Sequence, residues 1–408
     1  MSDRAVYRVT VYETGINFPC AEDEFVLKAM MSAGRGPIRH GCCGGGCGVC
    51  RMRVISGIYQ KEKRMSRAHV SESEEREGVV LLCCIQPRSD LTIMMDRRDI
   101  MGFKGTLRPG LVQLRVLDLD KTLDFYTRVL GLDIVGRTSD GRVMLKTYDE
   151  FDHHSVTLRL ADEAGLDYVA FKVGSPEALE EMKAKTAAFG YYVTELPANA
   201  EQPGFGKRYS FRICTGHTFQ IYSEVALAEK GPQIKNPDIW TTPPRGMRAE
   251  RMDHFLLYGP NITEAERFCK EVFGMYVPEV CNTADGNRLA AWITSSNKPH
   301  DLAFVEYPQP GKIHHLGFYL HDWRDVGDAA DLIAINHLKL DIGPTRHAIT
   351  RGHTIYFWEP SGNRIEVYAG GYTAYPDNPQ RVWDASQLGR GLFYYSGEMI
   401  PSFLEIVT

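Results

Sequence analysis

Four cysteines and five glycines are crowded into residues 41–50, near the start of this 408-residue chain. Cys42, Cys47 and Cys50 are separated by four and two residues, and Cys83 follows as a distant fourth thiol. Four thiolates at this spacing can hold a [2Fe-2S] cluster. The glycines suit such chemistry because the loop must wrap tightly around metal in conformations that a Cβ atom would hinder. Its backbone N–H groups can then face the anionic sulfurs.

A zinc ribbon and a set of spare thiols are the alternatives to an iron-sulfur cluster in this loop. Zinc ribbons usually carry two CxxC pairs, whereas this sequence carries one CxxxxCxxC triple and a single remote cysteine. The spacing therefore favours the iron-sulfur cluster. Cys43 and Cys84 lie next to predicted ligands, and we expect neither of them to bind metal.

An internal repeat runs through the rest of the chain. Residues 125–132 (FYTRVLGL) match 268–275 (FCKEVFGM), and residues 215–222 (TGHTFQIY) match 361–368 (SGNRIEVY). The first pair has the pattern of a helix end followed by a capping glycine, and the second that of a turn leading into an alternating strand. Two homologous α+β modules are therefore expected.

The second module has potential metal ligands at three positions where the first has none: His254 opposite Gln113, His315 opposite Tyr168, and Glu366 opposite Gln220. Two histidines and one carboxylate form the facial triad that binds ferrous iron and leaves positions open for substrate and dioxygen. A single histidine on an apolar strand is more often a core residue. Three ligand types at repeat-equivalent positions nevertheless favour an Fe(II) site.

The composition restricts the class of protein. With 43% hydrophobic and 24% charged residues, the chain is expected to fold into globular domains. A net charge of -5 gives no indication of nucleic-acid binding. The N-terminal sequence lacks the apolar stretch of a signal peptide, and no run approaches the roughly 18 apolar residues that cross a membrane. We therefore expect no membrane association and a cytoplasmic protein, in which clustered thiols hold metal.

Residues 5–98 resemble plant-type ferredoxins, through the cysteine spacing and the SDLTI segment after the fourth cysteine. The resemblance implies a β-grasp domain at residues 1–100 whose four cysteines hold a [2Fe-2S] cluster. One feature departs from the family. Residues 1–100 contain 15 Lys and Arg against 13 Asp and Glu, a net charge of +2, whereas many plant ferredoxins are strongly acidic. The surface that meets the electron donor is therefore expected to differ.

Residues 107–408 resemble catechol 2,3-dioxygenases, the extradiol enzymes of the vicinal oxygen chelate superfamily. The resemblance rests on these motifs: RPG (108–110), MDHFLLYG (252–259), IHHLGF (313–318), DIGPTRH (341–347), TIYFWEPSGNRIEVY (354–368) and LGRGLFYY (388–395). It implies an α+β fold of two repeated modules that contain βαβββ units. The metal-free module would span residues 107–225 and the Fe(II)-binding catalytic module 248–372, with a packing tail at 373–408.

The resemblance also implies a reaction. A catechol would chelate Fe(II) beside O2, and its ring would open next to the diol to give a 2-hydroxymuconic semialdehyde-type product. His300 would assist oxygen and act as acid or base, His347 would hydrogen-bond a substrate oxygen, and Tyr356 would help to deprotonate and hold the catechol. An imidazole that titrates near neutrality suits such proton transfers. The family further implies a homo-oligomer, a tetramer.

Some catechol 2,3-dioxygenases are served by a separate plant-type ferredoxin that reduces oxidised iron, so this chain resembles a fusion of the two. An NAD(P)H-dependent ferredoxin reductase would then supply the electrons. The alternatives are a component of a multi-protein oxygenase that uses electrons in every turnover, a non-enzymatic electron carrier with a ligand-binding module pair, and a glyoxalase-like isomerase. His153 and His154 lie in the metal-free module, and we expect them to form a surface pair.

Overall fold

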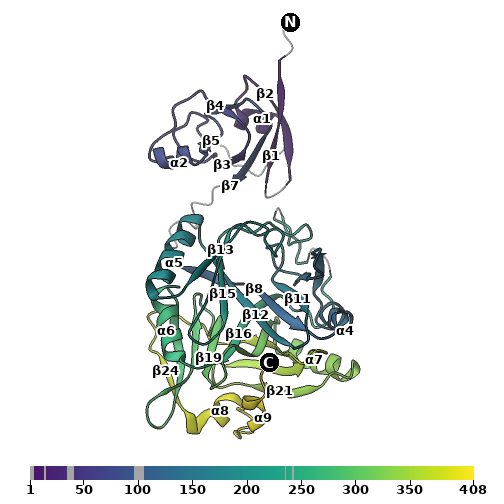
Figure 1. Ribbon diagram of the computed structural model, residues 1–408. Helices are drawn as coiled ribbons and strands as arrows, with labels where there is room; N and C mark the ends of the chain where they lie inside the picture. Colours follow the sequence, from purple (N-terminus) through teal and green to yellow (C-terminus); the bar gives the residue numbers. More distant parts are fainter. Residues whose placement is uncertain (1–3, 13–14, 35–40, 96–104, 235, 241–242) are drawn as a thin grey trace. The chain divides into compact units, whose positions relative to one another are not determined.

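The computed structural model describes residues 4–12, 15–34, 41–95, 105–234, 236–240 and 243–408. The chain forms two compact units, Met1–Ile100 and Met101–Thr408 (Figure 1). The domain boundary expected at residue 100 lies within residues 96–104, outside the described ranges. Within these ranges no helix combines the length and apolar character needed to cross a membrane.

The first unit contains a five-stranded sheet, a separate two-stranded sheet and two short helices. Its elements are β1 (Val6–Val11), β2 (Asn17–Ala21), α1 (Val26–Ser32), β3 (Arg51–Ser56), β4 (Tyr59–Lys61), α2 (Glu72–Arg76), β5 (Val79–Leu81), β6 (Ile85–Pro87) and β7 (Leu91–Met95). The strand order is β2-β1-β7-β3-β5, with β1 and β7 parallel (Figure 1). Alternation along β1 buries Val9 and Val11, which pack with the buried face of α1. This is the ferredoxin-type β-grasp that the sequence predicted.

The first module of the second unit is built on an eight-stranded sheet. Its elements are β8 (Thr106–Val116), α4 (Leu119–Asp124), η1 (Phe125–Val129), β9 (Asp133–Arg137), β10 (Val143–Lys146), β11 (Val156–Leu160), β12 (Gly165–Val173), α5 (Pro176–Phe189), β13 (Val193–Leu196), β14 (Arg208–Arg212) and β15 (Thr218–Tyr222). The strand order is β13-β14-β15-β12-β8-β11-β10-β9. The chain therefore passes twice through a βαβββ unit.

The second module repeats this plan on a nine-stranded sheet. Its elements are β16 (Arg251–Gly259), α6 (Ile262–Glu271), β17 (Tyr276–Asn282), β18 (Arg288–Thr294), β19 (Leu302–Glu306), β20 (Lys312–Tyr319), α7 (Trp323–Ile335), β21 (Leu340–Arg346), β22 (Gly352–Trp358), β23 (Arg364–Gly370), β24 (Arg381–Asp384), η2 (Ala385–Gln387), α8 (Leu388–Leu392) and α9 (Pro401–Glu405). The order β21-β22-β23-β20-β16-β19-β18-β17 matches the first module, and β24 adds an edge strand. The predicted fold of two repeated modules is confirmed.

A single apolar core joins the two modules. Phe171 on β12 lies with its ring centroid 6.2 Å from that of Phe255 on β16 and 5.3 Å from that of Phe273. The rings of Phe219 and Phe304 also meet across the two modules, at 6.5 Å. Because buried aromatic rings contribute much of a core's stability, the two modules are expected to unfold together.

The strand registers correct one equivalence between the modules. Ala170 on β12 pairs with Leu111, and at the corresponding place Gly317 on β20 pairs with His254. Ala170 pairs with Gln220 on β15, and Gly317 pairs with Glu366 on β23. Because Gln220 and Glu366 are equivalent positions of the repeat, Ala170 and Gly317 are counterparts. His254 is therefore the counterpart of Leu111, and the prediction that it lies opposite Gln113 was wrong by two residues. The pattern could not reveal this slip because side chains two residues apart share one face of a strand.

Replacing Phe171 by alanine should destabilise the second unit by about 3–5 kcal/mol, because the change removes a buried ring from the core that joins the modules. Phe171 is 0% exposed. All five tryptophans of the chain belong to the second unit, so their fluorescence during urea unfolding reports on that unit. Tyr192→Ala is the control, since Tyr192 is 87% exposed and its loss should change the free energy of unfolding by less than about 0.5 kcal/mol. Equal effects of the two changes would contradict a shared core.

Candidate functional site

Three neighbouring strands bring one potential ligand each to the same point of the second module. β16 carries His254, β20 carries His315 and β23 carries Glu366. Their ligand atoms all lie within 4.8 Å of one another. The Nε2 atom of His254 is 2.7 Å from Oε2 of Glu366 and 3.2 Å from Nε2 of His315. Among the described residues of the second unit, no other group of three His, Cys, Asp or Glu side chains is placed to hold a metal ion.

The electrostatics of this group suit a cation. Burial favours the neutral form of Glu366, but the two imidazoles outweigh it and hold the pKa of this carboxyl well below its usual range. Burial lowers the pKa of His315 to about 4, so this imidazole is neutral. One anionic oxygen and imidazole nitrogens converging on one point form a donor set that fits a ferrous ion, bound through one face of its octahedron.

Each ligand side chain has one buried partner that fixes its orientation: Asp253 for His254 (3.1 Å to Nδ1), His314 for His315 (2.7 Å between Nδ1 atoms) and Thr354 for Glu366. Partners of this kind set the tautomer of a metal-binding histidine and the direction of its ring. None of the three partners was predicted from the sequence, although a signal was present. Asp253 and His314 directly precede the histidines they hold, and Thr354 lies two residues before Tyr356 on the same face of β22.

Asp253 is itself held by a buried ionic network. It accepts a hydrogen bond of 2.6 Å from the hydroxyl of Tyr368 and forms ion pairs with Arg251 and Lys298 at 3.0 and 3.1 Å. Burial would raise the pKa of Asp253, but Lys298 and the other partners keep it well below its usual range. The carboxylate therefore stays ionised and can hold His254 in one orientation.

A cavity of about 430 Å³ opens beside the three ligands. His300, His347 and Tyr356 line it together with the ligands, so the structure brings all six sequence-predicted residues of the second module to one place. Most of the remaining lining is apolar and includes Leu256, Ala290, Trp292, Ile349, Leu388 and Phe403. An apolar cavity with a few polar groups at one side suits a small aromatic molecule.

His347 and Tyr356 form a hydrogen-bonded pair in this cavity. The Nδ1 atom of His347 donates to the carbonyl of Leu392, so its Nε2 atom is free to accept the hydroxyl proton of Tyr356 at 2.8 Å. Burial lowers the pKa of His347, which keeps the imidazole neutral. Burial and the nearby Glu366 raise the pKa of Tyr356 well above its usual value. The pair can therefore accept and return one proton inside a water-poor cavity.

His300 presents a different kind of imidazole. Its ring centroid lies 4.2 Å from that of His254, and its buried Nδ1 atom has no hydrogen-bond partner among the residues that the structure describes. Burial lowers its pKa well below the usual value. Buried polar atoms without a partner are rare, and this one lies where a bound substrate or oxygen would supply the partner.

The corresponding place in the first module holds no metal ligands. The counterparts of the three ligands are Leu111, Tyr168 and Gln220. Gln220 accepts a hydrogen bond of 3.0 Å from Nε of the fully buried Arg208. The hydroxyl of Tyr168 accepts a hydrogen bond of 2.7 Å from Gln202. The first module thus fills this place with its own side chains, including a permanent cation.

The expectation of a surface pair at His153 and His154 was wrong for His154. This residue is 0% exposed, and its Nε2 atom lies 2.7 Å from Oε1 of Gln202. Burial lowers the pKa of His154 to about 3. His154 is therefore a neutral member of the polar cluster inside the first module.

In the first unit, backbone N–H groups of the glycine-rich loop face the cysteine sulfurs. Gly44 and Gly46 both donate to Sγ of Cys42 at 3.4 Å, and the N–H group of Cys42 lies 3.3 Å from Sγ of Cys47. The N–H groups of Gly44 and Gly46 lower the pKa of Cys42 to about 7, which favours the thiolate. Metal-bound sulfur is anionic, so the loop is arranged for the charge that it must carry.

Cys50 and Cys83 form the second pair of thiols. Both are buried, and a hydrogen bond from Cys50 lowers the pKa of Cys83. Gly45, with φ of +82°, lies where a Cβ atom would come within 2.5 Å of the carbonyl oxygen of Arg64 and 2.8 Å of Sγ of Cys84. Only glycine fits this cradle, which agrees with the role expected of the loop glycines.

Three protein-family models match the chain. The 2Fe-2S iron-sulfur cluster binding domain matches residues 9–88, the catechol 2,3-dioxygenase-like N-terminal domain matches 166–226, and the Glyoxalase/Bleomycin resistance protein/Dioxygenase superfamily matches 251–367. The metapyrocatechase of Pseudomonas sp. (strain CF600) is 42% identical over 306 residues, which cover 75% of this chain and 99% of that protein. The first unit is 47% identical over 89 residues to a plant-type ferredoxin of Pseudomonas putida, covering 22% of this chain and 79% of the ferredoxin.

Solved structures give the same result. The 2,3-dioxygenase LapB from Pseudomonas sp. KL28 is similar with a TM-score of 0.67 and 43% identity, covering 69% of this chain and 98% of that one. The paired modules and their site therefore define an extradiol dioxygenase with the vicinal oxygen chelate fold, fused to a [2Fe-2S] ferredoxin domain. The chain belongs to the metapyrocatechase family. The predictions of fold, enzyme class and the two cofactors, Fe(II) and a [2Fe-2S] cluster, are confirmed, while the assignment of individual site residues stays a prediction.

Replacing His315 by phenylalanine should remove the mononuclear iron and leave the cluster, because the change deletes one of three converging ligands. Loss of an outer partner alone costs roughly 10–100-fold in metal affinity, so loss of a ligand should cost more. The matched control is Tyr168→Phe, which places the same ring at the counterpart position of the first module. Iron determination combined with the visible absorption of the cluster separates the two pools. Full mononuclear iron in His315→Phe would contradict the assignment.

Proposed function

We propose that the second unit cleaves the ring of catechol, or of a small substituted catechol, next to its two hydroxyl groups. O2 is the second substrate, and the product is of the 2-hydroxymuconic semialdehyde type. His254, His315 and Glu366 are the proposed Fe(II) ligands. The observation that carries the proposal is a single cavity in which the predicted ligands and the predicted acid-base residues all take part. The 42% identity with a metapyrocatechase supports the same activity.

Bound Fe(II) would supply a Lewis-acid centre with open positions for the diol oxygens and O2. The protein side chains manage the protons. The neutral His347 and the hydroxyl of Tyr356, 2.8 Å apart, can accept a proton from the diol and keep it inside the cavity. His300 lines the same cavity with an unpartnered nitrogen and can hold a second proton for return to the cleaved product. Three groups at one side of the cavity thus provide general acid-base catalysis.

The cavity walls favour an uncharged aromatic ring. Trp292, Leu256 and Phe403 line the cavity, and at about 430 Å³ it accepts one substituted benzene ring. Phe403 belongs to α9 in the C-terminal tail, so the tail supplies part of the substrate contact. This supports catechols with small apolar substituents as the substrate class.

The Fe(II)-loaded protein should convert catechol in air to a yellow product without any added reductant, because both atoms of O2 would enter the product and the reaction would consume no external electrons. Absorption spectroscopy during the first turnovers measures this directly. Tyr356→Phe, which removes the hydroxyl that donates to His347, should lower kcat by about 10²–10⁴-fold at unchanged iron content. Strict dependence on NADH and a reductase would instead favour an oxygenase that consumes electrons in every turnover.

We further propose that Cys42, Cys47, Cys50 and Cys83 hold the [2Fe-2S] cluster and that the cluster reduces catalytic iron after accidental oxidation to Fe(III). Plant-type clusters have potentials near about -400 mV, which gives ample driving force for this reduction. Fusion in one chain supplies the reductant at a high effective concentration. The 47% identity of the first unit to a plant-type ferredoxin supports an electron-transfer role.

An NAD(P)H-dependent ferredoxin reductase is the proposed electron donor to the cluster. The first unit has 15 basic and 13 acidic residues, a net charge of +2, so a reductase with an acidic docking face fits it best. We propose a cytoplasmic location, where thiols stay reduced and NAD(P)H is present. By analogy with the family, we propose that the protein assembles as a homotetramer.

Reactivation can be tested with Cys47→Ser and the matched control Cys43→Ser. Cys47 is a proposed cluster ligand, whereas the neighbouring Cys43 is exposed and is not. After inactivation by peroxide, the parent and Cys43→Ser should regain activity with NADH and a ferredoxin reductase, and Cys47→Ser should not. Fresh Fe(II) with ascorbate should restore all three proteins, which shows that the catalytic site is intact. Equal recovery of all three with NADH and reductase would rule out the proposed role of the cluster.

A further inference from the structure

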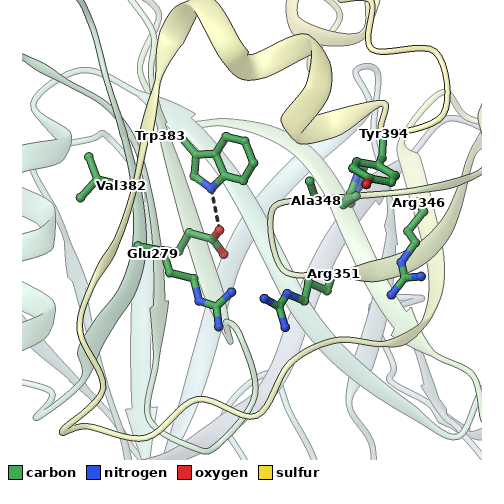
Figure 2. Close-up of a pocket in the computed structure, with 9 residues that line it drawn as sticks. Glu279, Arg346, Ala348, Arg351, Val382, Trp383 and Tyr394 are labelled. Atoms are coloured by element: carbon green, nitrogen blue, oxygen red, sulfur yellow. Dashed lines mark hydrogen bonds between the residues drawn. The ribbon is translucent and has the colours of Figure 1, made fainter.

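A second cavity of the second unit, of about 610 Å³, lies outside the catalytic cavity (Figure 2). It is bordered by β24, by the end of β21 and the turn that follows it, and by a residue of the C-terminal tail. Its lining is rich in arginine and aromatic side chains, namely Arg346, Arg351, Arg381, Trp383 and Tyr394, and it includes one carboxylate, that of Glu279. Three guanidinium groups and one carboxylate thus carry the charge of this cavity.

The carboxylate of Glu279 is already satisfied by other groups. It accepts hydrogen bonds from the N–H group of Thr350 at 3.0 Å, the hydroxyl of Tyr372 at 2.9 Å and the indole of Trp383 at 2.7 Å. Figure 2 shows the bond from Trp383 as a dashed line. Glu279 is buried and is not within ion-pair distance of any guanidinium group among the described residues. It therefore leaves the positive charge of the arginines largely uncompensated.

The three guanidinium groups make no hydrogen bond or ion pair in the part of the chain that the structure describes. Arg381 stacks on the ring of Tyr372 at 3.8 Å, which fixes its plane and leaves its N–H groups free. Arg351 has a left-handed φ of +59° in the turn after β21. Arg346 and Arg381 are partly buried and Arg351 is exposed, whereas the partly buried Arg288 and the buried Arg364 of this unit bind carboxylates.

We propose that this cavity binds a small oxyanion, a carboxylate or a phosphate. Three guanidinium groups around one cavity repel one another, and an oxyanion removes the repulsion through short charge-assisted hydrogen bonds. Trp383 and Tyr394 add flat walls that suit an unsaturated carboxylate. None of its arginines lines the catalytic cavity, so the anion would bind outside the place proposed for ring cleavage.

One residue connects the two cavities. His347 lines both of them, and its neighbour in the chain is Arg346. The carbonyl of Arg346 also accepts a hydrogen bond of 3.0 Å from the N–H group of Tyr394, which ties the wall of the anion cavity to the tail that lines the catalytic cavity. An anion bound by Arg346 and Arg351 would therefore brace the segment that positions His347.

Calorimetric titration of the full-length, iron-loaded protein tests the proposal, with inorganic phosphate and benzoate as probes and chloride used to hold ionic strength constant. The parent should bind at least one of these anions saturably, once per chain. Arg351→Gln should weaken binding by roughly tenfold or more, because a hydrogen bond to a charged group is lost. Arg351→Lys should fall between these two. Arg390→Gln is the control, since Arg390 is an exposed arginine outside both cavities and its loss should leave the affinity unchanged.

The two probes distinguish a carboxylate from a phosphate as the ligand of this cavity. Tighter binding of benzoate supports an unsaturated carboxylate, and tighter binding of phosphate supports a phosphate. Arg346→Gln serves as a second variant of the same cavity and should also weaken binding. Absence of saturable binding by the parent would overturn the proposal. Equal affinity in the parent and both glutamine variants would also overturn it, because the anion would then bind elsewhere, for instance at the catalytic iron.

Discussion

The second unit depends above all on the burial of one carboxylate between two imidazoles. A buried, unpaired carboxylate costs several kcal/mol, so Glu366 is tolerated only because His254, His315 and Thr354 surround it. Each of these partners comes from a different strand, and each must lie at the correct position in the register of its strand. The registers of β16, β20, β22 and β23 are therefore constrained by one charge as well as by the apolar core. The proposed metal ion would complete an arrangement that the strands have already assembled.

The first module shows that the fold itself does not require metal. It has the same strand order, yet it places Arg208 beside Gln220 at the position where the second module places Thr354 beside Glu366. The guanidinium group of Arg208 supplies a positive charge from within the chain, so the polar cluster of the first module needs no bound cation. Both modules then share one apolar core, so the metal-free module contributes stability to the unit without contributing ligands. The asymmetry between the modules is thus a difference in chemistry on a common scaffold.

Much of the fold and part of the site could be predicted from the sequence, because cysteine spacing, strand alternation and an internal repeat are all local patterns. The two-residue slip of β8 against β16 could not be detected, since alternation is the same after a shift of two. The burial of His154 and the network around Asp253 depend on contacts between distant segments, which no local pattern records. His300 and His347 came only from family resemblance, because a lone histidine in a loop has no periodic signal. The arginine-lined cavity could not be predicted from the sequence either, because its lining residues come from separate segments of the chain.

The charge of the proposed ligand set also bears on why the proposed reductant would be useful in this chain. Metal binding would require both imidazoles in their neutral form, so Glu366 would be the only anion among the three proposed ligands. The buried site therefore compensates one charge of Fe(II) and leaves a larger excess on Fe(III), which low-dielectric surroundings disfavour. Empty of substrate, such a site should resist oxidation and be easily reduced. An anionic catecholate reverses this preference by adding negative charge beside the metal. Oxidation should therefore occur mainly during turnover, when the proposed electron donor in the same chain would be of most use.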